Sequence, residues 1–86
     1  MVIFVTSKIA YREMESLILT GDYPIWLTDR ILEKREIEIL WQKNIELSVF
    51  NHEVDTSNKV ELDCALETIR EHHPGKSIWV QFESGN

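Results

Sequence analysis

Polar side chains that could bind a ligand or transfer a proton follow three short apolar runs of this 86-residue sequence. Ser7 comes shortly after the first run, Asp29 after the second and His52 after the third. If the runs are parallel strands, these residues lie at their carboxyl ends, where α/β proteins bind ligands. A serine before a helix start suits an anion, and a histidine near a carboxylate suits acid–base chemistry. Ser7, Asp29 and His52 therefore form a candidate site for a small ligand or phosphate, or for an enzyme.

Several features favour a role without catalysis. The sequence contains no glycine-rich phosphate-binding fingerprint, and caps and turns place polar residues at strand ends in every α/β protein. His72 and His73 are adjacent, so on a helix their side chains would point about 100° apart and would seldom share a metal. The single cysteine, Cys64, permits no intramolecular disulfide and no thiolate zinc site, and we expect it to be buried. We expect no metal and no cofactor.

A stripe of acidic residues is the sharper feature. Asp63, Glu67 and Glu71 recur at every fourth position, which stacks them along one side of a helix. Like charges at this spacing cost a few tenths of a kcal/mol per pair, so the stripe is unfavourable for the helix itself. Two further acids, Glu53 and Asp55, lie in the segment just before it. A chain that tolerates this repulsion could present the surface to a basic partner, although a merely solvated acidic helix face is the plain alternative.

The net charge of −6 agrees with binding to a basic partner and disfavours nucleic acids and anionic membranes as direct partners. The sequence therefore favours a small acidic protein-binding module that inhibits or regulates a basic protein, as immunity proteins and inhibitors do. The predicted surface consists of Glu53, Asp55, Asp63, Glu67, Glu71 and Trp79. The N-terminal apolar run is too short for a signal peptide, which favours a cytoplasmic location.

The elements that must position these residues alternate between strand and helix over a single domain, residues 1–86. Apolar or alternating segments predict strands, and amphipathic segments of 10 to 15 residues predict helices. The predicted strands cover residues 1–5, 25–27, 45–50 and 77–82. The predicted helices cover residues 10–20, 30–44 and the segment that begins after Asn58 and ends at the His72–Gly75 turn.

This alternation predicts an α/β fold with a small four-stranded, mainly parallel sheet, a miniature of the flavodoxin type. The run Val2–Val5 is apolar throughout, which is typical of an interior strand covered on both faces. We expect the strand order 2-1-3-4, with the first helix on one face and the other two helices on the opposite face. The alternative is a mixed sheet in which an edge strand, most naturally the last, runs antiparallel.

The last predicted strand could also form an interface. Ile78, Val80 and Phe82 alternate there with Trp79 and Gln81, as on an edge. Its composition favours burial of Trp79, as it does for the other two tryptophans, Trp26 and Trp41. If Trp79 is exposed instead, it could anchor a partner or join two copies of the chain through this strand.

Overall fold

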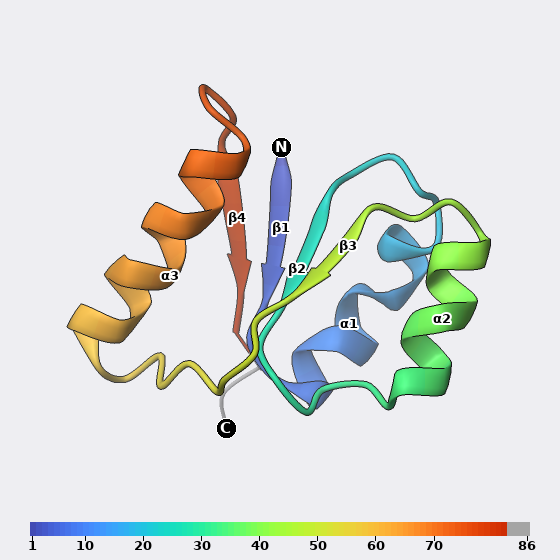
Figure 1. The fold of residues 1–86 in the computed structure, drawn as a ribbon, viewed down its shortest axis with the longest axis horizontal. Helices are drawn as coiled ribbons and strands as arrows, with labels where there is room; N and C mark the ends of the chain where they lie inside the picture. Colours follow the sequence, from blue (N-terminus) through green and yellow to red (C-terminus); the bar gives the residue numbers. More distant parts are fainter. Residues whose placement is uncertain (83–86) are drawn as a thin grey trace.

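A computed structural model describes residues 1–82 of the chain. Within them, four strands alternate with three helices in the predicted order (Figure 1). The strands are β1 (Val2–Val5), β2 (Ile25–Leu27), β3 (Leu47–Val49) and β4 (Ile78–Gln81). The helices are α1 (Lys8–Ile18), α2 (Lys34–Gln42) and α3 (Lys59–His72).

The strands form one sheet in which every neighbouring pair is parallel, so the predicted α/β class is confirmed. The alternative with an antiparallel edge strand is wrong, because β4 runs parallel to β1. All four residues of β1 are at most 1% exposed, as its uninterrupted apolar sequence predicts for an interior strand.

The strand order is β3-β2-β1-β4, not the expected 2-1-3-4. The chain moves in one direction across the sheet from β1 through β2 to β3, and then returns to place β4 on the other side of β1. The topological switch point therefore lies between β1 and β4, whereas we expected it between the first and third strands. At this point Thr6 donates to the carbonyl oxygen of Gln81 through both its hydroxyl, at 2.9 Å, and its backbone N–H, at 3.3 Å.

The faces that the helices cover follow from this order. Because crossovers of one hand place helices on one face while the chain advances in one direction, α1 and α2 share a face and α3 covers the other. Figure 1 shows α3 on one side of the sheet and the other two helices on the opposite side. The expected grouping of the second and third helices is thus wrong.

Two apolar cores result, one on each face of the sheet. The core under α1 and α2 contains Ile3, Val5, Ile25 and Leu27 from the strands. The core under α3 contains the strand residues of opposite orientation, with Phe50, Ala65 and Ile69 packed on them. Each interior strand therefore contributes apolar side chains to both layers, which fixes its register through the alternation of side chains.

The helix starts position the polar residues considered above. Ser7 is the N-cap of α1, and its hydroxyl accepts from the Ala10 N–H at 3.1 Å. Asn58 caps α3 in the same way, through a side-chain oxygen that accepts from the Val60 N–H at 3.0 Å. The second helix begins at Lys34 rather than at residue 30, because Arg30 adopts a left-handed conformation, with φ 65°, that no helix can continue.

Burial of all three tryptophans is not observed. Trp26 is 7% exposed, but Trp41 and Trp79 are 53% and 52% exposed. Trp79 lies on the face of β4 opposite to Ile78 and Val80, which pack into the core under α3. As β4 is an edge strand, the helices on the Trp79 side leave that side chain half uncovered.

Candidate functional site

Parallel strands bring their polar carboxyl ends to one end of the sheet. A hollow of about 290 Å³ opens there, which we call the carboxyl-edge hollow. Its polar lining comes from the turn after β1, the turn after β2 and the loop after β3. The charged and hydroxyl side chains around it belong to Thr6, Ser7, Lys8, Thr28, Asp29, Arg30 and Glu53.

Two of the three predicted ligand-site residues meet in this hollow. Ser7 and Asp29 both line it, since β1 and β2 are neighbours and end at the same level. The Asp29 carboxylate accepts from the N–H of Arg30 at 3.0 Å, which ties it into its own turn. Thr28 lies behind them, only 4% exposed, and its hydroxyl donates to the Thr6 carbonyl at 3.4 Å.

His52, the third residue, contributes only its backbone to this region. Its carbonyl accepts from the Asp29 N–H at 3.3 Å, but its ring lies elsewhere. The ring packs edge-on against Phe50, with centroids 5.8 Å apart, and Nδ1 is 3.0 Å from the Asn51 amide oxygen. The structure therefore brings Ser7 and Asp29 together without an imidazole between them.

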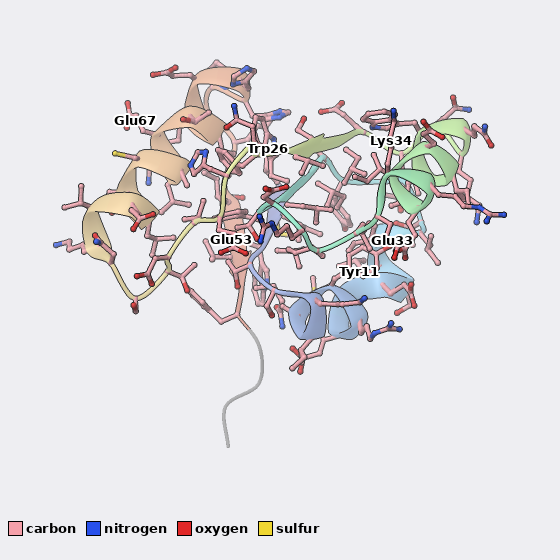
Figure 2. All side chains as sticks on the ribbon, turned by 60° about the horizontal axis from the view of Figure 1, so that its bottom comes forward. Tyr11, Trp26, Glu33, Lys34, Glu53 and Glu67 are labelled. Carbon is pink, nitrogen blue, oxygen red and sulfur yellow. The ribbon has the colours of Figure 1, made fainter. Side chains whose placement is uncertain are left out.

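The charges around the hollow are mixed. Lys8 and Arg30 provide two cations near the N-terminus of α1, where the helix dipole also favours an anion. Asp29 and Glu53 oppose them with two carboxylates. Glu53, predicted as part of the acidic surface, thus lies at this hollow; Figure 2 shows it near the centre of the molecule, well apart from Glu67 on α3.

The acidic stripe lies on the side of α3 that faces away from the sheet. At about 100° per residue, Asp63, Glu67 and Glu71 project opposite to the core residues Ala65 and Ile69. All three acids are exposed. The one ion pair in the stripe joins Glu67 Oε2 to Arg70 Nη1 at 3.7 Å, between two exposed side chains, and such pairs contribute little.

Asp55 lies in the loop before α3, and its carboxylate is held by the turn that follows. It accepts from the Ser57 hydroxyl at 2.6 Å and from the Ser57 N–H at 3.0 Å. These bonds stabilise the charged form and lower the pKa of Asp55 below its usual value. The loop therefore keeps a negative charge next to the start of α3.

A second hollow, which the sequence did not suggest, runs beside the acidic stripe. Its volume is about 150 Å³ and its lining is mainly apolar. Val60, Cys64 and Thr68 line it from α3, and Phe50 and His52 line it from the end of β3. The sequence signal that could have indicated this hollow is the series of uncharged residues at positions 60, 64 and 68. It recurs at every fourth residue, as the acids do, and so forms a second row beside them on the helix.

Cys64 is exposed, which corrects the expectation that it is buried. It occupies the flank of α3 between the acidic stripe and the core positions. Its thiol therefore lines the apolar hollow rather than the core.

Trp79 lies at the β4 edge, apart from the α3 stripe with which it was grouped. Its indole N–H donates to the side-chain oxygen of Gln81 at 2.8 Å, so the ring lies along its own strand. The predicted partner-binding residues thus divide among three places: the carboxyl-edge hollow with Glu53, the α3 region with Asp55 and the stripe, and the β4 edge.

Two further properties concern residues 1–82 alone. No helix in this part of the chain has the length and apolar character needed to cross a membrane. No three of its histidine, cysteine, aspartate or glutamate side chains lie together as a group able to hold a metal ion.

Comparisons of the chain with protein-family models, with curated proteins and with solved structures find no match.

Proposed function

We propose that this protein is a small non-catalytic binding module that engages a basic protein surface through α3 and so inhibits or regulates its partner. The observation that carries the proposal is the unequal distribution of charge across the sheet. Residues 1–44, which include both helices of one face, carry seven acids and six bases. Residues 50–72, which include the helix of the other face, carry six acids and two bases.

The repulsion within the acidic stripe supports a role in binding. Among the described residues only Glu67 of the stripe forms an ion pair, with Arg70; Asp63 and Glu71 form none, although Lys59 lies one turn before Asp63. A concentrated field of one sign speeds the encounter with an oppositely charged partner and orients it. Removal of this repulsion by the partner's cations would add to the affinity.

The apolar hollow beside the stripe offers the apolar contact that an interface made only of charges would lack. Protein interfaces combine an apolar centre with a polar rim, and much of their energy comes from a few side chains buried in pockets. Val60 and Cys64 line the hollow, and Glu61 stands at its border. A partner segment with one aliphatic or aromatic side chain between basic residues would fit both the apolar hollow and the acidic stripe. The single free thiol accords with a cytoplasmic setting for this interaction.

The test is an affinity capture from the lysate of the source organism at low and high salt. A variant with Asp63→Lys, Glu67→Lys and Glu71→Lys is compared with the matched control Glu15→Lys, Asp22→Lys and Glu38→Lys. Both variants change the net charge equally, but the control residues are exposed acids outside α3. We expect a basic protein that is captured at low salt, released at high salt, lost with the α3 variant and retained by the control.

Alkylation of Cys64 provides an independent readout, because the thiol lies in the hollow beside the stripe. The captured partner should slow the reaction of Cys64 with iodoacetamide. Equal capture by both triple variants, or an unchanged alkylation rate in the complex, would contradict the proposal.

A second candidate function, the binding of a small anion at the carboxyl-edge hollow, has one specific observation in its favour. Ser7, Asp29, Lys8 and Arg30 meet there although they come from two separate turns. Thermal-shift titrations with inorganic phosphate and with nucleoside phosphates test this candidate. Lys8→Gln should abolish any shift and Lys76→Gln, an exposed lysine far along the chain, should preserve it; no shift in the native protein would rule these anions out.

A further inference from the structure

The outer edge of β4 carries backbone groups that β1 does not use. The Val2 and Thr6 N–H groups donate to the carbonyl oxygens of Ser77 and Gln81, at 2.8 and 3.3 Å. Since the backbone direction alternates along a strand, the groups of Trp79 also point toward β1. The N–H and C=O groups of Ile78 and Val80 therefore point outward, and such a row is a template for pairing with another strand.

On the opposite edge of the sheet, a side chain covers one of the outward backbone groups. Glu46 and Phe50 bond to β2, so the groups of Leu47 point outward from β3. The Trp41 indole N–H donates to this outward Leu47 carbonyl at 3.0 Å and caps it. Among the described residues, no side chain caps the outward groups of Ile78 or Val80 in this manner.

The chemistry of β4 suits a second copy of the same chain. No residue from Ser77 to Phe82 is charged, although the protein has a net charge of −6. Contact between the α3 faces of two copies would place acids against acids, whereas β4 itself brings no charged side chains together. Open edges are usually protected by lysine, proline or other charged residues, and here Trp79 and Phe82 are instead about half exposed.

We infer that two copies pair through β4, antiparallel about a twofold axis, to form one eight-stranded sheet. Centring the pair on Trp79 lets Ile78 of each copy exchange both backbone hydrogen bonds with Val80 of the other. The two Trp79 residues then face each other as a non-hydrogen-bonded pair, the position at which cross-strand side chains are closest. The same axis keeps both α3 helices on one face, so the acidic stripes stay accessible.

The pairing is expected to be weak. Four-residue strands and one aromatic pair bury less surface than a stable dimer requires, and small interfaces have dissociation constants of about 10 μM or higher. Sedimentation velocity of the full chain between about 10 μM and 1 mM should show a monomer–dimer equilibrium in this range. Sedimentation as a monomer at the highest concentration would overturn the inference.

Two variants locate the interface. Trp79→Lys places like charges opposite each other and should raise the dissociation constant at least about tenfold. Ile39→Lys adds the same charge at an exposed apolar residue that lies on α2, away from β4, and should leave it unchanged. Equal effects of the two substitutions, or no effect of Trp79→Lys, would contradict pairing through β4.

Amide hydrogen exchange on the unmodified chain tests the same point without substitution. The outward N–H groups of Ile78 and Val80 should exchange more slowly as the protein concentration rises, because only the second copy protects them. The N–H of Val49, which points outward from β3, should exchange at a constant rate. Dimerisation without protection of Ile78 and Val80 would assign the interface to another surface.

Discussion

The indole Nε1 of Trp26 donates a hydrogen bond to Nε2 of His73 at 3.1 Å and so joins β2 to the end of α3. The two rings meet nearly at right angles, with centroids 6.1 Å apart. His73 follows α3 as its C-cap, and Glu46 stands 3.8 Å from the same Nε2. Because Trp26 is buried, its N–H depends on this acceptor for a hydrogen bond, and the bond ties the end of α3 to the sheet.

The first prediction concerns this contact. His73→Phe keeps an aromatic ring beside Trp26 but removes the acceptor, so the buried N–H loses its partner. We expect the free energy of unfolding in urea to fall by about 1–3 kcal/mol. His72→Phe is the matched control, because His72 also contacts the Trp26 ring but is exposed and has its Nδ1 next to the Thr68 carbonyl oxygen. Equal losses in the two variants would show that the Trp26–His73 bond contributes nothing specific.

The second prediction separates stability from binding at a single residue. Glu67 has an acid four positions before it and another four positions after it, so Glu67→Lys turns two repulsions into two attractions. We expect the free energy of unfolding to rise by about 0.5 kcal/mol, after the loss of the weak pair with Arg70. The same substitution should weaken capture of a basic partner. A variant that is both less stable and fully competent in binding would contradict the role given to the stripe.

A third prediction concerns the ionisation of Asp55. The Ser57 hydroxyl is the largest cause of its lowered pKa, so Ser57→Ala should raise the pKa of Asp55 toward its usual value of 3.8. Since the folded chain favours the carboxylate, this stabilisation is present above that value and is lost as the pH falls through the lower folded pKa. An NMR titration of the Asp55 carboxyl carbon measures both variants. An identical pKa in the two proteins would show that the backbone N–H groups of Ser57 and Asn58, not the Ser57 hydroxyl, set the shift.

The fold class could be read from the sequence because the apolar pattern is strong. Alternating strands and helices imply parallel crossovers, and the α/β class follows from this alternation. The interior position of β1 follows from its uninterrupted apolar run. The strand order was missed although the signal was present. Ile25, Trp26 and Leu27 are all apolar, so β2, like β1, is an interior strand, whereas the expected order left it at an edge. The alternating sequences of β3 and β4 are those of the two edges.

The candidate site was predictable only as far as the strands reach. Ser7 and Asp29 follow neighbouring strands within two residues, so their proximity follows from the sheet alone. The direction of His52 is set by an irregular loop and by the Phe50 ring, and no side-chain period describes either. Exposure of Trp79 depends on which half of the sheet α1 and α2 cover, which the sequence of β4 does not specify.

The last prediction concerns Arg30, whose backbone is left-handed at the border of the carboxyl-edge hollow. This conformation costs an ordinary residue about 1 kcal/mol or more, and glycine adopts it without strain. Arg30→Gly should therefore raise the free energy of unfolding by up to about 1 kcal/mol, less the added freedom of the unfolded chain. Asn44→Gly is the control, because Asn44 has a similar φ of 62° but tolerates it better and should change less. If Arg30→Gly stabilises the protein and also removes a phosphate-induced thermal shift, then Arg30 contributes to anion binding in the hollow and not to the stability of the fold. A loss of stability would instead show that the Arg30 side chain holds the turn after β2 in place.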